Sequence, residues 1–411
     1  MLMSKKFKYL DDLIHSGAKE IVLDSDIVLG ADEWSKYEEG IKLNVDGLAI
    51  DGNGHTIDAK EKTRIFHCTG KNIALKNIKL KNGFSGGSGG AIENTGKLTV
   101  TGLTFTGNGA IEYGGGAIFN NGTLTIAEST FTDNEAIDYG NGGAIQNAGN
   151  LTVTKSEFRD NRTRQAGGAI GNTGKSSIAE STFMDNAARG EYGKGGAVFN
   201  SGELTITGSA LRENIANSCG GAIQNAGKLT VTGSTFADNA AQEDYSRNNE
   251  CHGGAINNLG CELTISESVF TGNIAQDDGG AIYNLSGELT ISESTFSDNA
   301  SQGEYWGGGA ICNLSGEITI SETVFNSNNA EMSGGAVYNE ADLIISETVF
   351  NSNNAEADGG AVYNETDLTI AESTFMENTA LEDGGAIFSS SFGSLDLNNC
   401  TFKDNRPDDV H

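Results

Sequence analysis

The sequence lacks several features that would assign it to a common protein class. Its 411 residues include one proline, Pro407, near the C-terminal end. No stretch of about 18 apolar residues occurs, so we expect no membrane-spanning helix. The six cysteines lie far apart, without C-x-x-C spacing or the density of a disulfide framework. We interpret them as ordinary small residues.

Basic residues are also few. The 26 lysines and arginines are outnumbered by 56 aspartates and glutamates, which gives a formal charge of -30. Such a charge repels nucleic acids and anionic membrane surfaces, so we exclude nucleic-acid binding and expect neutral or cationic partners. By itself, such a charge is typical of a soluble protein whose copies repel one another. The oligomeric state does not follow from it.

The first residues do not predict a signal peptide. Lys5 and Lys6 could precede the apolar part of such a signal, but Asp11 and Asp12 interrupt it. A short amphipathic helix is predicted instead by apolar residues at helical spacing, namely Phe7, Leu10, Leu13 and Ile14. We expect this helix, within residues 1–20, to cap the open end of a solenoid, where exposed strands and core invite aggregation.

Glycine is abundant, with 57 residues, and much of it belongs to a repeat. The tetrapeptide Gly-Gly-Ala-Ile/Val occurs twelve times, with its first glycine at Gly89, Gly115, Gly142, Gly167, Gly195, Gly220, Gly253, Gly279, Gly308, Gly334, Gly359 and Gly384. A second tetrapeptide, Phe-x-x-Asn, follows each copy, although Leu211 replaces the phenylalanine once. A Leu-x-Ile/Val segment, such as Leu98 to Val100, lies between the two.

Three short strands per period, joined by glycine-containing turns, predict an all-β fold. We expect a single-stranded right-handed parallel β-helix, a solenoid with three strands per coil and the short N-terminal capping helix. The predicted divisions are the capping helix in 1–20, irregular first coils in 21–88, the twelve-copy repeat in 89–405 and a C-terminal tail in 406–411.

Side-chain alternation predicts which positions face the core. In the first strand of each copy, the Ile or Val is constant and so is the Asn two residues later, except for Ser389 in the last copy, while the residue between them varies, as in Ile92, Glu93 and Asn94. The constant pair is therefore expected to point inward. Stacked inward asparagines can exchange amide hydrogen bonds along the column, so we predict Asn ladders with a structural role.

The paired tetrapeptides resemble the repeats of chlamydial polymorphic outer-membrane proteins and of adhesin-like β-helix proteins from bacteria and methanogenic archaea. The likeness covers residues 89–405. The segment 45–57 is similar to the opening coils of many such helices, including pectate-lyase-like ones. The resemblance implies adhesion or surface display at the cell surface or outside the cell, and it supplies no catalytic residues. Without a predicted signal peptide, an intracellular location stays open.

No catalytic motif is evident in the sequence. The five histidines are scattered without metal-ligand spacing, and no Ser-His-Asp arrangement can be defended. We therefore expect no enzyme but a binding or surface-display scaffold for a glycan or protein ligand. The alternative is a polysaccharide-acting enzyme on the same fold, a pectate-lyase-like lyase or a glycosidase, with carboxylates gathered across coils and a basic residue as the base.

Two outward columns could carry a function. One is aromatic and is expected either to bind sugars or a protein, or only to stiffen the sheet by stacking; it comprises Phe119, Phe199, Tyr283, Tyr338, Tyr363 and Phe388. The other is acidic, and its carboxylates either spread into water or bind calcium weakly; it comprises Glu267, Glu293, Glu322, Glu347 and Glu372. No other cofactor is predicted.

The loops between Phe-x-x-Asn and the next Gly-Gly-Ala differ in length, and the longer ones share a dipeptide. Each contains an acidic residue followed by tyrosine, whereas the five-residue loops contain no tyrosine. All these loops should leave one corner of the coil, so we predict a ligand-binding edge there. Its predicted residues are Tyr113, Tyr139, Tyr192, Tyr245, Tyr305 and Trp306. The alternative is that each tyrosine folds back over the neighbouring coil.

Overall fold

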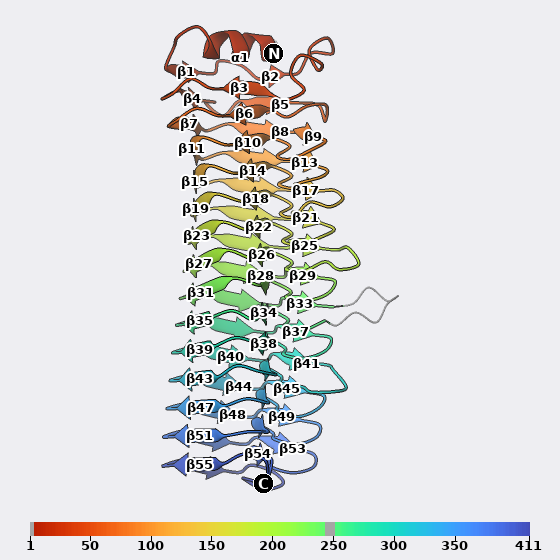
Figure 1. The fold of residues 1–411 in the computed structure, drawn as a ribbon, viewed down its shortest axis with the longest axis vertical. Coiled ribbons are helices and arrows are strands. Elements are labelled where there is room, and N and C mark those ends of the chain that lie inside the picture. Colours follow the sequence, from red (N-terminus) through yellow and green to blue (C-terminus); the bar gives the residue numbers. More distant parts are fainter. Residues whose placement is uncertain (1–3, 243–250) are drawn as a thin grey trace. The chain divides into compact units, whose positions relative to one another are not determined.

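The computed structural model describes residues 4–242 and 251–411. The chain divides into two compact units, Met1–Leu204 and Thr205–His411, and each is a parallel β-helix of stacked coils (Figure 1). The predicted right-handed parallel β-helix is confirmed. Each regular coil passes through four strands, one more than predicted, and every strand pairs with its counterparts in neighbouring coils.

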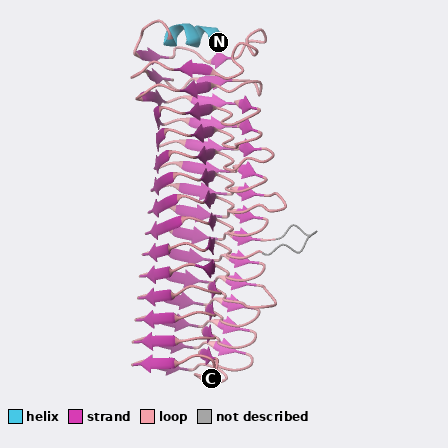
Figure 2. Ribbon diagram, viewed as in Figure 1, coloured by secondary structure: helices cyan, strands magenta, loops and turns pink. Residues whose placement is uncertain are grey.

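The predicted N-terminal helix is present as α1 (Phe7–Ile14), the helix coloured cyan in Figure 2. Phe7, Leu10 and Ile14 are fully buried, because the apolar face of α1 covers the first coil. The helix begins where the backbone N–H groups of Phe7 and Lys8 donate to the Glu33 carboxylate, at 3.2 and 3.0 Å. An acidic partner suits the unsatisfied N–H groups of a helix N-terminus.

Sheet 1 takes the strand of the Gly-Gly-Ala-Ile/Val tetrapeptide. Pairing is parallel and in register, so Ile92 lies opposite Ile118 and Asn94 opposite Asn120. In the first unit its strands are β3 (Ile41–Leu43), β6 (Phe66–Cys68), β10 (Ile92–Asn94), β14 (Ile118–Asn120), β18 (Ile145–Asn147), β22 (Ile170–Asn172) and β26 (Val198–Asn200). In the second unit they are β30 (Ile223–Asn225), β34 (Ile256–Leu259), β38 (Ile282–Ser286), β42 (Ile311–Asn313), β46 (Val337–Asn339), β50 (Val362–Asn364) and β54 (Ile387–Ser389).

Sheet 2 takes the Leu-x-Ile/Val strand, and β27 (Glu203–Thr207) of this type contains the division between the units. In the first unit its strands are β1 (Glu20–Val22), β4 (Ala49–Asp51), β7 (Ile73–Lys76), β11 (Lys97–Thr101), β15 (Thr123–Ala127), β19 (Asn150–Thr154) and β23 (Lys175–Ala179). In the second unit they are β31 (Lys228–Thr232), β35 (Leu263–Ser266), β39 (Leu289–Ser292), β43 (Ile318–Ser321), β47 (Leu343–Ser346), β51 (Leu368–Ala371) and β55 (Leu395–Asn398).

Sheet 3 takes the strand centred on the phenylalanine. In the first unit its strands are β2 (Ile27–Val28), β5 (Thr56–Asp58), β8 (Lys79–Lys81), β12 (Thr104–Thr106), β16 (Thr130–Thr132), β20 (Glu157–Arg159) and β24 (Thr182–Met184). In the second unit they are β28 (Ala210–Arg212), β32 (Thr235–Ala237), β36 (Val269–Thr271), β40 (Thr295–Ser297), β44 (Val324–Asn326), β48 (Val349–Asn351), β52 (Thr374–Met376) and β56 (Thr401–Lys403).

Sheet 4 was not predicted, because its strands have two residues each, too few to show alternation. In the first unit they are β9 (Phe84–Ser85), β13 (Gly109–Ala110), β17 (Glu135–Ala136), β21 (Arg162–Thr163) and β25 (Ala187–Ala188). In the second unit they are β29 (Ile215–Ala216), β33 (Ala240–Ala241), β37 (Ile274–Ala275), β41 (Ala300–Ser301), β45 (Asn329–Ala330), β49 (Asn354–Ala355) and β53 (Thr379–Ala380). The segment predicted as a tail continues two sheets, since Arg406 bridges Thr379 of sheet 4 and Val410 bridges Ile387 of sheet 1.

The glycine pair of each copy is required by the corner between sheets 4 and 1. Gly308 has a φ of +71°, and a Cβ there would lie 2.2 Å from the Ile311 carbonyl oxygen. A Cβ on Gly309 would lie 2.2 Å from the carbonyl oxygen of Gly335 in the next coil. Glycine is therefore needed once for the left-handed backbone and once for close approach between coils.

The core consists of stacked identical side chains, as the alternation predicted. Ile92, Asn94, Leu98, Val100 and Phe105 are all fully buried. The phenylalanine rings stack face to face on successive coils, with centroid distances of 4.4 Å for Phe105 and Phe131, 4.7 Å for Phe131 and Phe158, and 4.7 Å for Phe270 and Phe296.

The asparagines of sheet 1 form the predicted ladder, and the asparagines of Phe-x-x-Asn form a second one. The Asn258 side-chain amide donates to Asn284 Oδ1 at 2.7 Å, and that of Asn273 donates to Asn299 Oδ1 at 2.9 Å. A third ladder was not predicted: the backbone N–H of Ser268 donates to Ser294 Oγ at 3.1 Å. Its signal was the Ser or Thr two residues before most of the phenylalanines, with Leu103 and Cys400 as the exceptions.

Replacing one stacked ring should destabilise the second unit. We expect Phe296→Ala to lower the free energy of unfolding by about 3 to 5 kcal/mol, because it leaves a cavity between the rings of neighbouring coils. The outward neighbour Thr295→Ala is the matched control and should cost about 0.5 kcal/mol or less. Chemical denaturation of both variants measures the difference, and equal stabilities would contradict the stacked core.

Candidate functional site

The loops that follow sheet 4 form an exposed edge in each unit. Four of the predicted tyrosines have largely exposed side chains: Tyr113 at 65%, Tyr139 at 81%, Tyr192 at 63% and Tyr305 at 82%. These rings are therefore largely open to solvent. Tyr245 lies outside the described residues. We call the exposed tyrosines and their loops the tyrosine edge.

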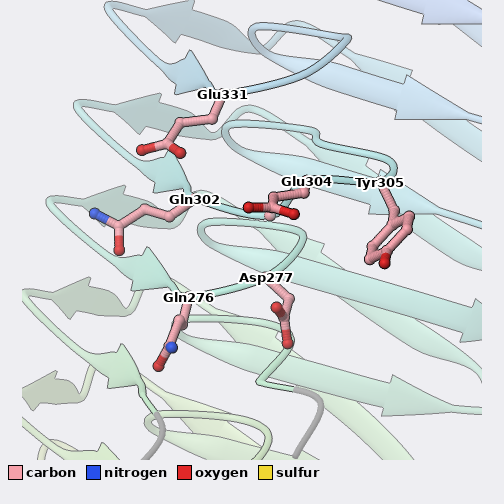
Figure 3. A pocket seen from close by; sticks show the side chains of 7 residues that line it. Gln276, Asp277, Gln302, Glu304, Tyr305 and Glu331 are labelled. Carbon is pink, nitrogen blue, oxygen red and sulfur yellow. The ribbon is translucent and has the colours of Figure 1, made fainter. Parts of the chain in front are cut away.

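In the second unit, part of the tyrosine edge borders a pocket of about 450 Å³. Figure 3 shows Gln276, Gln302 and Glu331 one above another, with Asp277 and Glu304 beside them and the Tyr305 ring across from the column. The column arises because Gln276, Gln302 and Glu331 directly follow the sheet 4 strands β37, β41 and β45, respectively.

The pocket is rich in hydrogen-bonding groups and acidic. Its carboxylates come from Asp277, Glu304 and Glu331, and its amides from Gln276 and Gln302. Asp277 Oδ2 also accepts the backbone N–H of Cys251 at 2.6 Å, which fixes that carboxylate against the preceding coil. Amides beside carboxylates next to an exposed ring can bind a polar ligand with one flat apolar face.

Trp306 faces a different environment from Tyr305. It is half-buried and packs against the cluster of Tyr283, Cys312 and Tyr338 on the outer face of sheet 1. Its ring centroid lies 6.4 Å from that of His252. The structure thus separates the two residues that were predicted to act together: Tyr305 is displayed, while Trp306 anchors the loop.

A buried His-Asp pair holds the base of the same loop. His252 Nδ1 lies 3.3 Å from Asp278 Oδ2, and both side chains are almost fully buried. Asp278 Oδ1 accepts the backbone N–H of Gly307 at 2.9 Å, and the His252 ring stacks on Tyr283 at 4.1 Å. Sequence reasoning missed this pair, because a scattered histidine gives no signal of its partner.

The aromatic column on sheet 1 was expected to be exposed, and this prediction was wrong for its centre. Tyr283 and Tyr338 are 4% and 5% exposed, in a cluster with Cys312 against which Trp306, Leu314 and Tyr363 pack. The alternative of stacking along the sheet is confirmed, with centroid distances of 4.9 Å between Tyr338 and Tyr363 and 5.0 Å between Tyr363 and Phe388.

Two tyrosine-glutamate pairs lie along this column. The Tyr338 hydroxyl donates to Glu340 Oε1 at 2.9 Å, and the Tyr363 hydroxyl donates to Glu365 Oε1 at 3.2 Å. Burial raises the pKa of Glu340 above its usual value, and the nearby Glu365 carboxylate adds to this. Burial, with the Glu365 charge, also raises the pKa of Tyr363 to about 12.

The predicted acidic column lies in the turns between sheets 2 and 3. All five residues are exposed, and each has a positive φ, as in Glu267 at 50° and Glu322 at 47°. Among the described residues, no group of three or more His, Cys, Asp or Glu side chains is placed to hold a metal ion. Calcium binding by Glu267, Glu293, Glu322, Glu347 and Glu372 stays a prediction.

Three family models match parts of the chain. They are the right handed beta helix region over residues 255–408, the pectate lyase-like adhesive domain over residues 8–112 and the Chlamydia polymorphic membrane protein repeat over residues 128–148. The chain is a right-handed parallel β-helix repeat protein. The matches confirm the resemblance to right-handed β-helix repeat proteins that the tetrapeptides predicted.

Solved structures similar to this β-helix include two alginate lyases. AlyF-OU02, in complex with G6, is 13% identical, with 93% of this chain and 86% of that chain covered and a TM-score of 0.41. The PL6 family alginate lyase AlyGC is 9% identical, with 98% of this chain and 89% of that chain covered and a TM-score of 0.26. Likeness at this level carries no argument about activity. No curated protein matches the sequence. Among the described residues, no helix is long and apolar enough to cross a membrane.

The Tyr338-Glu340 pair predicts a pH-dependent effect. Because the pKa of Glu340 is raised in the folded state, ionisation costs stability as pH rises from the unfolded value, about 4.3, through the folded value. Glu340→Gln removes this cost and still accepts the Tyr338 hydroxyl. We expect melting temperatures near those of the wild type at about pH 4 and a relative gain for the variant towards neutral pH.

Melting curves from acid to neutral pH test this, with the exposed Glu356→Gln as the control, for which no comparable gain is expected. If the difference in melting temperature between Glu340→Gln and the wild type does not change with pH, the raised pKa of Glu340 is contradicted.

The calcium hypothesis has its own test. A cation bound between carboxylates of neighbouring coils would reduce their repulsion, so it predicts a saturable heat of binding and a higher melting temperature with calcium. The double variant Glu322→Gln/Glu347→Gln should lose both effects. If calorimetry finds no heat with the wild-type protein, the column is only a solvated surface.

Proposed function

We propose that this β-helix is a non-catalytic binding scaffold displayed at the cell surface, and that its tyrosine edge binds a neutral glycan. The observation that supports this most is the pocket beside Tyr305, where an exposed aromatic ring lies next to carboxylates and amides. The matched families are named for adhesion and for membrane proteins, which supports a surface location and a binding role.

The groups in the pocket favour a glycan over other ligands. A sugar ring offers an apolar face that can stack on Tyr305, while its hydroxyls can donate to Asp277 and Glu331. The amides of Gln276 and Gln302 can both donate to and accept from hydroxyls. A ligand that carried negative charge would be repelled by three carboxylates, so the favoured glycan is neutral.

The scaffold is suited to repeated, weak contacts. In the first unit, Tyr113 and Tyr139 lie in loops of neighbouring coils, which are about 5 Å apart along the stack. A long glycan could contact several loops at once, and linked weak contacts bind far more tightly than each alone. This accounts for a row of similar dipeptides where an enzyme would need one constellation of different groups.

Substituting the exposed tyrosines tests the proposal. We expect replacement of Tyr113, Tyr139, Tyr192 and Tyr305 by Ser to weaken binding to the best neutral glycan on an array at least about tenfold, because each ring contributes roughly 1 kcal/mol. The melting temperature should change little, since the four rings are largely exposed. The matched control is Leu381→Ser in a five-residue loop, where the side chain is 71% exposed.

Three results would overturn the proposal. Unchanged glycan binding by the tyrosine variant would remove the edge as a site. Binding of a basic protein but of no glycan would assign the edge to a protein partner. Release of unsaturated or reducing ends from a polysaccharide by the wild-type protein would show catalysis and favour the polysaccharide-acting alternative.

A further inference from the structure

Two cysteines of the second unit lie in neighbouring coils, just before the glycine pairs that open sheet 1. Cys219 directly precedes Gly220, and Cys251 stands two residues before Gly253. The side chain of Cys219 is 8% exposed, and that of Cys251 is fully buried. Both are thiols in the structure. The other copies of the repeat have no cysteine at these positions, so the two residues were not selected by the coil itself.

The pairing of the two coils places these cysteines next to each other. The backbone N–H of Gly220 donates to the His252 carbonyl at 2.9 Å, so Cys219 lies opposite His252. Cys251 is one residue further back along the neighbouring coil. Coils are about 4.8 Å apart and residues about 3.3 Å apart along a strand, so the two cysteine Cα atoms are about 6 Å apart. Disulfide bonds join Cα atoms that are about 4.4 to 6.8 Å apart.

The two sulfur atoms also lie beside the same stretch of backbone. The Cys251 thiol donates to the Asn217 carbonyl oxygen at 3.8 Å, so this side chain points back to the preceding coil. The Ser218 hydroxyl donates to Cys219 Sγ at 3.5 Å. The backbone of Cys251 is fixed as well, because its N–H donates to Asp277 Oδ2 at 2.6 Å. Both thiols are thus held at one place between two coils.

The other four cysteines are not placed for such a bond. All six cysteines are among the residues that the structure describes. Cys261 is in the same coil as Cys251, but β34 separates the two. Cys68 and Cys312 lie within sheet 1, where the strands on either side carry no cysteine at the opposite position. Cys400 directly precedes β56, the last strand.

We propose that Cys219 and Cys251 form a disulfide bond that joins two successive coils of the β-helix. The oxidant is a low-molecular-weight disulfide. The Cys219 thiolate, on the more exposed residue, attacks one of its sulfurs and releases the first small thiol. The Cys251 thiolate then attacks the Cys219 sulfur of this mixed disulfide and releases the second. Two protein thiols are oxidised, one small disulfide is reduced to two thiols, and the two cysteine protons end on those thiols.

The bond closes the loop of residues 219–251. This loop includes most of the longest insertion of the repeat, the thirteen residues between Asn239 and Gly253. Closing a loop restricts the unfolded chain, so the oxidised second unit is the more stable form. The bond also ties Cys251 to the coil before it, and the Cys251 N–H holds the Asp277 carboxylate of the pocket at the tyrosine edge. Disulfides persist outside the cell, where the proposed display would place the chain, but the pairing itself does not depend on that proposal.

Thiol counting on the full chain tests the proposal. The reduced protein is incubated with oxidised glutathione, both folded and in urea just below its unfolding midpoint, and the remaining thiols are blocked and counted by mass spectrometry. We expect six thiols before oxidation and, with two lost, four afterwards. Digestion should yield one linked peptide pair, which contains Cys219 and Cys251. The melting temperature should rise by at least about 5 °C on oxidation and fall back when the bond is reduced.

The matched control is Cys261→Ser, which removes a half-buried cysteine of the same coil and should leave the linked pair and the gain in melting temperature intact. Cys219→Ser and Cys251→Ser should each form no linked pair and show no gain on oxidation. Each variant is compared with itself before and after oxidation, which separates the bond from any cost of the substitution. Retention of all six thiols in both conditions, pairing of either residue with another cysteine, or glutathione on Cys219 as the end product would overturn the proposal.

Discussion

Hydrogen bonds between identical asparagine amides on successive coils set the geometry of the whole structure. A buried amide without a partner costs about 1 to 3 kcal/mol, so each copy must place its asparagine directly against the next. Asn258 meets this requirement by donating to Asn284 and accepting from Asn225, at 2.7 and 2.6 Å. The same register then places phenylalanine on phenylalanine and the close-approach glycine against the next coil's glycine carbonyl.

The requirement applies to the strands and leaves the loops free. After sheet 4 the chain has no further core position until the next glycine pair, so insertions of several residues do not disturb the ladders. Variation therefore gathers at one corner of the coil, and functional residues on loops held by a rigid scaffold are common in proteins. Within one such loop, Trp306 is half-buried as an anchor, whereas Tyr305 is displayed.

Stacking also multiplies whatever charge the repeat carries. An acidic residue in the same turn of successive copies becomes a column of like charges, as from Glu267 to Glu372. The irregular first coils escape this, and residues 1–88 hold 13 basic and 13 acidic residues. One chain thus combines an electroneutral first segment with an acidic repeat.

The sequence by itself determined the coil, its register and its core. The recurring Ile-x-Asn, Leu-x-Ile and Phe-x-x-Asn segments permit one inward face, so three of the four strands of a coil, the asparagine ladder of sheet 1 and the helix over the first coil were predictable. The position of exposed tyrosines at the loop edge was predictable too, because loop length varies independently of the core.

Only the tertiary structure decided what lies outside the coil. Tyr338 occupies an outward position, yet it is buried in a cluster with Tyr283 and Cys312 against which Trp306 packs, and no local pattern in the sequence records that packing. The partners of His252 and Glu33 lie about 26 residues away, at positions the repeat does not mark. The strand pattern predicts the periodic core. Contacts between loops and outer faces depend on where each loop packs, and this position is defined only once the coils are stacked.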